Sequence, residues 1–308
     1  MSSHFSHRHL YGIEPLSRHD IETILKLANK YADSNRTNEK QLDRLRGKIV
    51  VNMFFENSTR TRTSFEVAAK RLGADVVNFT STTSSMNKGE TFSDTMRVIN
   101  AMRVDAFVIR HSEDGAVKLA TNYVEGSVIN AGDGKNEHPT QALLDALTLW
   151  RHKGRIEGLK VAICGDIKHS RVARSNALLL GKMGAEVRFF SPPHFMMPDQ
   201  ESLGVVTCES FESAVADADA VMMLRIQNER LAEGEHTMSD AEYHALYGLT
   251  HERLRPAQPN VIVMHPAPIN RGVEITSELA DDLQYSVIFE QMEMGVAARM
   301  ACLDLLLS

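Results

Sequence analysis

The residues best suited to chemistry follow the apolar run from Lys48 to Phe55, where a strand pattern gives way to hydroxyls and guanidiniums. This polar set, which stands where the next predicted helix begins, is Ser58, Thr59, Arg60 and Thr61. A helix N-terminus presents unpaired backbone N–H groups and the positive end of its dipole, so an anion there gains hydrogen bonds and a favourable field. Hydroxyl and guanidinium donors are suited to phosphate. The segment therefore predicts a phosphate site.

Ordinary helix capping is the alternative explanation for the serine and threonine of this segment. Capping does not explain Arg60 and Arg62, because the dipole at a helix N-terminus disfavours cations. We therefore weight the anion site above the cap.

The size and charge of the chain set its class. Its 308 residues are enough for two α/β domains with separate cores, and 43% hydrophobic with 24% charged residues is ordinary globular composition. A net charge of −6 opposes a broad nucleic-acid surface. The sequence contains no uninterrupted run of about 18 apolar residues, so no membrane span is predicted. Its polar first residues do not have the pattern of a secretory signal. We expect a soluble protein that binds neither nucleic acid nor membranes.

The metal-binding residue types do not form a convincing site. Cys164, Cys208 and Cys302 lie far apart without Cys-x-x-Cys spacing, which argues against a zinc site and a disulfide framework and favours a reducing cytoplasm. His4, His7 and His9 are an alternative metal set, but we favour a solvated arm because ligands also need fixed geometry. No metal and no organic cofactor are expected.

Strands and helices alternate along most of the chain, which predicts parallel sheets with right-handed crossovers. We expect an α/β fold of two doubly wound parallel-sheet lobes with the active site between them, divided as 1–150 and 151–287, with the C-terminal helix 288–308 packing back on the first lobe. The predicted strands are 48–55, 75–79, 105–110, 127–130, 160–164, 186–190, 205–208, 218–224 and 261–264, and the principal predicted helices are 17–31, 61–72, 90–102, 138–152, 171–183 and 288–307.

Polar segments recur where these predicted strands end. In open parallel sheets, ligands bind beyond the carboxyl ends of the strands. The segments so placed are 58–61, Arg110, 136–141, 168–171, 225–227 and 265–268. Their repeated placement predicts one ligand-binding crevice.

Five motifs give the chain a family resemblance over nearly its whole length. They are Phe-Phe-Glu-Asn-Ser-Thr-Arg-Thr-Arg at 54–62, Lys-Gly-Glu-Thr at 88–91, His-Pro-Thr-Gln at 138–141, Leu-Arg-Ile-Gln-Asn-Glu-Arg at 224–230 and Met-His-Pro-Ala-Pro at 264–268. The chain resembles the aspartate and ornithine carbamoyltransferases. The Ser-Thr-Arg-Thr element is specific to carbamoyltransferases, and the other motifs separate the branches of that family.

The resemblance implies a first lobe that binds carbamoyl phosphate. It implies substrate contacts from Ser58, Thr59, Arg60, Thr61, Arg110, His138, Gln141, Ala267, Pro268 and Ser84, with Arg60, Thr61, Arg110 and His138 as the catalytic set. Thr61, Arg110 and His138 would hold the carbonyl oxygen, where negative charge develops. Gln141 would accept from the carbamoyl NH2 beside the Ala267 carbonyl, and a cis X-Pro bond is one conformation open to that proline-rich loop.

The second lobe would bind the amine acceptor. The two carboxylates of aspartate call for cations, and the resemblance supplies Lys88, Arg171 and Arg225, with Gln227 in support. Taken singly, Arg171 also reads as a solvated helix residue and Arg225 as an interdomain salt bridge. Ornithine enzymes usually carry a His-Cys-Leu-Pro loop, whereas this chain has His-Pro-Ala-Pro, so we favour aspartate as acceptor and an early step of pyrimidine biosynthesis.

The resemblance also implies a homotrimer with shared active sites, in which the loop of Ser84 and Lys88 reaches a neighbouring subunit. It implies that Glu56 and Arg230 bridge the lobes on closure, and the polar segment 229–239 suggests a lid. Whether regulatory chains or a dihydroorotase partner join the trimer is left open. The alternatives are a carbamoyltransferase for ornithine or another amine, and a non-catalytic two-lobed sensor of phosphate-containing anions.

Overall fold

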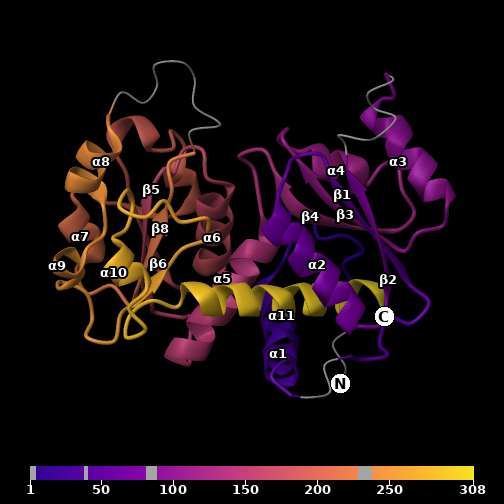
Figure 1. Cartoon of the computed structure of the whole chain (residues 1–308), viewed down its shortest axis with the longest axis horizontal. Coiled ribbons are helices and arrows are strands. Elements are labelled where there is room, and N and C mark those ends of the chain that lie inside the picture. Colours follow the sequence, from indigo (N-terminus) through magenta and orange to yellow (C-terminus); the bar gives the residue numbers. More distant parts are fainter. Residues whose placement is uncertain (1–4, 38–40, 81–88, 228–237) are drawn as a thin grey trace. The chain divides into compact units, whose positions relative to one another are not determined.

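The chain forms two compact units. The computed structural model describes residues 5–37, 41–80, 89–227 and 238–308 (Figure 1). Unit 1 comprises Met1–Leu147 with Glu293–Ser308, and unit 2 comprises Thr148–Met292. Each unit is built around its own parallel sheet, and each is described by itself.

Unit 1 contains a four-stranded parallel sheet in the order β2-β1-β3-β4. Its strands are β1 (Ile49–Phe54), β2 (Asp75–Thr80), β3 (Ala106–His111) and β4 (Ser127–Asp133). β-Branched and aromatic residues favour the pleated, half-buried surface of a strand, and β1 and β3 supply Val51, Met53, Phe107 and Ile109 to the core. Phe54 is in register with Arg110, so β1 and β3 end side by side.

The helices of unit 1 begin where the sequence supplies caps. Ser17 caps the first helix, and Asp20 returns the bond to the Ser17 backbone, which completes a capping box. The helices are α1 (Arg18–Ser34), α2 (Thr59–Arg71), α3 (Phe92–Ala101) and α4 (Ala116–Ala120), with parts of α5 (Pro139–Lys153) and α11 (Ile288–Leu307). The unit boundaries fall inside α5 and α11, so each unit includes a part of both helices.

Unit 2 contains a five-stranded parallel sheet in the order β7-β6-β5-β8-β9. Its strands are β5 (Lys160–Gly165), β6 (Glu186–Phe190), β7 (Val206–Thr207), β8 (Ala220–Leu224) and β9 (Ile262–Met264). Its other elements are α6 (Arg171–Lys182), the 3-10 turns η3 (Pro193–Phe195) and η4 (Gln200–Leu203), α7 (Phe211–Val215), α8 (Asp240–Tyr247), α9 (His251–Leu254) and α10 (Ser277–Ala280). Val221, Met223 and Val263 are among the residues of its core.

The expected pair of parallel-sheet α/β lobes is confirmed, while several element ends differ from the prediction. α2 begins at Thr59, two residues before the predicted start at Thr61. β4 continues to Asp133, beyond the predicted end at Asn130, where the Gly132 N–H donates to Asn130 Oδ1 at 2.7 Å. Among the helices in the described ranges, none is long and apolar enough to traverse a bilayer.

Candidate functional site

The predicted phosphate segment lies between β1 and α2. Ser58 is the N-cap residue of α2 in extended conformation, but its side chain makes no capping hydrogen bond, so the capping interpretation is wrong for Ser58. The bond from Arg62 N–H to Ser58 O, at 3.1 Å, is the first of the helix ladder. The N–H groups of Thr59, Arg60 and Thr61 precede that first ladder donor, as at every helix start. These N–H groups are the donors that the predicted phosphate would use.

Arg110 stands at the end of β3 beside this segment. Its Nη2 donates to Glu56 Oε1 at 2.7 Å and its Nη1 to the Ala131 carbonyl at 3.2 Å. The Arg110 side chain is 12% exposed, so its pair with Glu56 is largely withdrawn from water. The Phe55 N–H donates to the Arg110 carbonyl, which fixes the end of β1 against the end of β3. The predicted partner of Glu56, Arg230, lies outside the described residues.

His138 and Gln141 lie at the start of α5, and both are buried. The turn that presents them is held by two carboxylates, of which Glu137 lies in the predicted polar segment 136–141 without a predicted role and Asp133 was not predicted. Asp133 Oδ1 accepts from the Glu137 N–H at 3.1 Å, and Glu137 Oε2 accepts from the Ile13 N–H at 2.8 Å. The last strand of the sheet thus leads directly into the predicted catalytic histidine.

Unit 1 therefore places part of the predicted carbamoyl phosphate set, namely residues 58–61, Arg110, His138 and Gln141, after the carboxyl ends of its strands. The ends of β1, β3 and β4 are adjacent because these strands are parallel neighbours. His111, the residue after Arg110, has its pKa lowered by burial, so it adds little positive charge at neutral pH.

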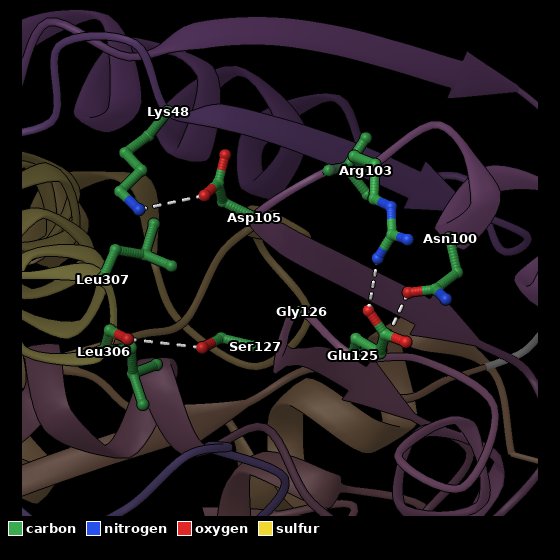
Figure 2. Close-up of a pocket in the computed structure, with 10 residues that line it drawn as sticks. Lys48, Asn100, Arg103, Asp105, Glu125, Gly126, Ser127, Leu306 and Leu307 are labelled. Carbon is green, nitrogen blue, oxygen red and sulfur yellow. Dashed lines mark hydrogen bonds and ion pairs between the residues drawn. The ribbon is translucent and has the colours of Figure 1, made fainter.

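A cavity of about 260 Å³ lies at the opposite edge of the same sheet (Figure 2). Figure 2 shows its charged groups already paired, with Lys48 Nζ 3.0 Å from Asp105 Oδ1 and Arg103 Nη1 2.8 Å from Glu125 Oε2. Ser127, the first residue of β4, lines it too. Because the strands approach it by their amino ends and its cations have carboxylate partners, this cavity is not the predicted phosphate site.

In unit 2, Arg171 is the first residue of α6, where Ser170 Oγ caps the helix by accepting from the Ala173 N–H at 3.2 Å. Arg171 is only 6% exposed, so the interpretation as a solvated helix residue is wrong. A buried guanidinium needs charge or acceptor partners. Gly165, just before this turn, has φ of +124°, and a Cβ there would lie 2.3 Å from the Leu224 carbonyl oxygen, so only glycine allows β5 and β8 to end this close together.

Arg225 and Gln227 follow β8 next to that turn. Arg225 Nη1 donates to the Ile226 carbonyl at 3.2 Å. Gln227 is held at both ends, since its backbone N–H donates to Asp166 Oδ2 at 3.1 Å and its Nε2 to the His169 carbonyl at 2.8 Å. Asp166 is fully buried and joins the ends of β5 and β8. Asp166 follows β5 directly, yet it was not among the residues predicted from the sequence.

The loop after β9 contains a cis peptide bond between Ala267 and Pro268, and Ala267 has φ of 55°. The Ala267 N–H donates to His265 Nδ1 at 2.9 Å, so the proton of the neutral ring lies on Nε2, which donates to Glu274 Oε1 at 3.0 Å. His265 and Glu274 are fully buried. The Ala267 carbonyl, the predicted acceptor, thus belongs to a loop fixed by a buried pair.

Some of the remaining predicted residues lie outside the part of the chain that the structure describes. Ser84 and Lys88 lie outside the described residues, as do residues 229–237 of the predicted lid. Of the three N-terminal histidines, His7 Nε2 lies 3.1 Å from Asp20 Oδ2, and His9 Nδ1 accepts from the Val128 N–H at 3.1 Å. Within residues 5–37, 41–80, 89–227 and 238–308, no three His, Cys, Asp or Glu side chains cluster to hold a metal ion.

Comparison with protein families matches both halves of the chain. Residues 8–151 match the aspartate/ornithine carbamoyltransferase carbamoyl-P binding domain, and residues 157–306 match the Asp/Orn binding domain of the same family. The aspartate carbamoyltransferase catalytic subunit of Rhizorhabdus wittichii is 58% identical, covering 99% of this chain and 96% of that relative. That of Rhodospirillum centenum is 56% identical, covering 98% and 95%.

Solved structures agree with these matches. Aspartate transcarbamoylase from Trypanosoma cruzi, in complex with carbamoyl phosphate and aspartate, superposes with a TM-score of 0.88 at 32% identity, covering 97% of each chain. Ornithine carbamoyltransferase from Pyrococcus furiosus gives 0.85 at 30% identity, also covering 97% of each. The fold alone thus does not separate the two branches. With both domain models and full-length relatives matched, the chain belongs to the aspartate/ornithine carbamoyltransferase family.

Proposed function

We propose that the chain transfers the carbamoyl group of carbamoyl phosphate to the α-amino group of L-aspartate, which yields N-carbamoyl-L-aspartate and phosphate. The reaction would be an early step of de novo pyrimidine biosynthesis. Relatives at 56–58% identity that are named aspartate carbamoyltransferase catalytic subunit support this choice of acceptor. The observation that carries the chemistry is the uncapped start of α2 beside Arg110 at the carboxyl edge of the unit 1 sheet.

Carbamoyl phosphate is bound at that edge by one set of groups for its phosphate and another for its carbamoyl group. Ser58, Thr59, Arg60 and Thr61 hold the phosphate with hydroxyls, a guanidinium and backbone N–H groups. Arg110 and His138, with Thr61, polarise the carbonyl oxygen. Gln141 and the Ala267 carbonyl, next to Pro268, accept from the carbamoyl NH2, and Ser84 adds a further contact.

Aspartate is bound by cations. The buried Arg171 and the partly buried Arg225 suit two carboxylates, because a guanidinium donates to a carboxylate by two parallel bonds. Gln227, which Asp166 and His169 hold in place, supports them. Lys88 completes the proposed set.

The reaction proceeds by direct attack. Carbamoyl phosphate binds first, and the lone pair of the aspartate α-amine then forms a C–N bond to the carbamoyl carbon. The C–O bond to phosphate breaks, and an oxygen of the departing phosphate accepts the amine proton. Donors aimed at the developing oxyanion and fixed positioning of both substrates lower the barrier, so no nucleophilic side chain is required.

Product formation from carbamoyl phosphate by the purified chain, with aspartate, ornithine and putrescine supplied in parallel, tests the proposal. Turnover with aspartate alone is expected. Turnover with another amine would overturn the roles of Arg171 and Arg225. Binding of carbamoyl phosphate without turnover of any acceptor would favour the two-lobed sensor.

The proposed assembly is a cytoplasmic homotrimer with shared active sites. Three free cysteines suit a reducing compartment. If Lys88 acts in a neighbouring subunit's site, mixing inactive Lys88→Ala and Arg60→Ala trimers and allowing exchange will restore sites that carry neither change. Activity that stays absent after exchange would contradict sharing. Size measurement of the purified chain, alone and from cells, tests the trimer and any regulatory or dihydroorotase partner.

A further inference from the structure

Gln141 is followed one helical turn later on α5 by a fully buried carboxylate, Asp145. Gln141 Nε2 donates to Asp145 Oδ1 at 3.0 Å. An ionised carboxylate only accepts hydrogen bonds, whereas a glutamine amide has one accepting and one donating end. An ionised Asp145 therefore selects the orientation of the amide, since only the NH2 end of Gln141 can face it.

Arg299 of α11 is a second buried ionisable group of this region, 4% exposed. Burial lowers its pKa, and the charges of Cys302 and the nearby Asp145 carboxylate act against that shift. Arg299 Nη1 donates to Ser64 Oγ at 2.8 Å, and the guanidinium lies 5.1 Å from the centre of the Phe65 ring, both on α2. Arg299 thus contacts α2, and Asp145 lies on α5. These are the two helices whose N-termini carry the proposed carbamoyl phosphate residues of unit 1.

The backbone of α11 is adapted to this guanidinium. A Cβ at residue 295 would lie 2.6 Å from Arg299 Nη1 and 3.2 Å from Leu144 Cδ2, and glycine occupies that position. The absence of a side chain gives the guanidinium room between α11 and α2. Gly295, one turn before Arg299 on the same helix, thus leaves space for the long Arg299 side chain.

We propose that Asp145 is a positioning residue that fixes Gln141 with its NH2 group inward and its carbonyl oxygen turned toward the carbamoyl NH2 of the substrate. Without the carboxylate, Gln141 could present its own NH2 to that group, and two donors would face each other. The inference deepens the proposed function and rests on it for the identity of the ligand. The orientation of Gln141 itself does not depend on turnover.

The test compares two ligands that differ only at the group proposed to donate to Gln141, the carbamoyl NH2. Acetyl phosphate carries a methyl group where carbamoyl phosphate carries NH2. In Asp145→Asn the preference for carbamoyl phosphate over acetyl phosphate should fall about tenfold, the worth of one hydrogen bond of about 1.4 kcal/mol. The affinity for acetyl phosphate should change less than twofold. In a Gln141→Ala background, Asp145→Asn should leave the preference unchanged, because the group being positioned is absent.

Asp304→Asn is the matched control. Asp304 is also a buried carboxylate of unit 1, and Arg44 Nη2 lies 3.1 Å from its Oδ1. Its loss should lower stability and leave the ligand preference as in the wild type. A purely structural role for Asp145 predicts equal weakening of both ligands, and that result, or an unchanged preference, would overturn the proposal.

A second readout needs neither activity nor a folded Asp145 variant. With selective ¹⁵N-glutamine labelling, the side-chain NH2 signals of Gln141 are identified by their loss in Gln141→Ala. In the wild type they should exchange slowly with solvent, because they are buried against Asp145, and rapid exchange would overturn the orientation. If Gln141 is protected but the wild type neither prefers carbamoyl phosphate nor turns over, the proposed function fails and the orientation stands.

Discussion

At the scale of single residues, Arg110 is the side chain that the proposed mechanism assigns to the charge that appears only during reaction. Its guanidinium already bonds the Glu56 carboxylate and the Ala131 carbonyl, so its position is fixed before a ligand arrives. A planar guanidinium offers five donors in a rigid fork, whereas a lysine ammonium is one compact point of charge. The shape of the group, and not its charge alone, suits Arg110 to this place.

Arg110→Lys should therefore lower kcat about 100-fold, the usual loss when a donor to a developing oxyanion is removed. Steady-state kinetics with carbamoyl phosphate and aspartate would measure it. Arg103→Lys is the control, because Arg103 is 81% exposed and pairs with Glu125 before the start of β3, and it should stay within twofold of the wild type. A kcat retained by Arg110→Lys would exclude Arg110 from the transition state.

The sequence identified the residues proposed to touch substrate and missed those that hold them. Asp133, Glu137, Asp145, Asp166 and Glu274 are buried carboxylates, although acidic side chains are ordinarily exposed. Glu137 accepts from Ile13, 124 positions away along the chain. Such partners have no local pattern. Gln141 and Asp145, four apart on one helix, did carry a local signal, since residues at that spacing are neighbours on a helix surface.

At the scale of elements, two helices of unit 1 begin with serine but use it differently. Ser17 caps α1 through a complete capping box, whereas the Ser58 side chain makes no such bond at α2. A hydroxyl that is not employed by its own helix is available to a ligand. The two serines therefore allow capping and anion binding to be measured separately.

Ser17→Ala should lower the free energy of unfolding by about 1 kcal/mol, the usual worth of an N-cap, and leave the affinity for inorganic phosphate unchanged. Ser58→Ala should do the reverse, with a stability change below about 0.5 kcal/mol and phosphate binding weakened about fivefold through loss of one hydrogen bond. Urea unfolding and phosphate titration of both variants measure this. A large stability loss in Ser58→Ala would restore the capping explanation.

Helix α11 buries ionisable groups in the core of unit 1. Burial raises the pKa of the Cys302 thiol from 9.0 to about 12 and lowers that of Arg299 to about 10. The folded protein therefore retains the Cys302 proton at pH values where the unfolded chain has released it. The stability linked to this raised pKa is fully present below pH 9 and is lost as pH rises toward 12.

The pH dependence of stability should accordingly differ between the wild type and Cys302→Ala. Between pH 7 and pH 9.5 the wild type should lose about 0.8 kcal/mol more than the variant, since only the wild type carries this thiol. Arg299, whose pKa is lowered to about 10, begins to titrate near the end of this window, but both proteins contain it, so the comparison isolates the thiol. Urea unfolding across the range measures the difference, which should be constant from pH 6 to pH 8. A difference that stays constant to pH 9.5 would refute the raised pKa.

Element types were predictable from local patterns and element ends were not. The apolar run of residues 160–164 predicts a buried strand, and the structure has strand β5 at Lys160–Gly165. The end of β4 depends instead on Gly132 and Asn130, whose N–H to Oδ1 bond extends the strand into a turn. The start of α2 moved because Thr59 and Arg60 took helical conformation without a side-chain cap, which no capping rule anticipates.

At the scale of the whole molecule, length and strand–helix alternation predicted two parallel-sheet lobes, which the two sheets confirm. The assignment of helices to units was harder to read. Periodicity reports which face of a helix is apolar but not which core that face joins. The boundaries of the units fall within α5 and α11, where the sequence shows no break.

This division predicts separable substrate defects. Arg171→Ala should raise KM for aspartate about 10–100-fold through loss of a charge-assisted bond. The calorimetric Kd for carbamoyl phosphate should be unchanged, because Arg171 of unit 2 is not among the proposed contacts of that substrate. Arg174→Ala, three residues later on α6 and near Asp199 at the surface, should change neither. Loss of carbamoyl phosphate binding in Arg171→Ala would contradict the division of roles.

Because unit 1 is assembled from Met1–Leu147 and Glu293–Ser308 while unit 2 is one continuous stretch, the order of synthesis is not the order of completion. A ribosome makes most of unit 1 first, yet Arg299 and Asp304, which bond Ser64 and Tyr31, are made only after unit 2. Domains ordinarily fold as units while the chain emerges. In this chain unit 2 is complete before the second segment of unit 1 has been made, so the edge of unit 1 proposed to bind the anion acquires its buried support only after unit 2 can fold.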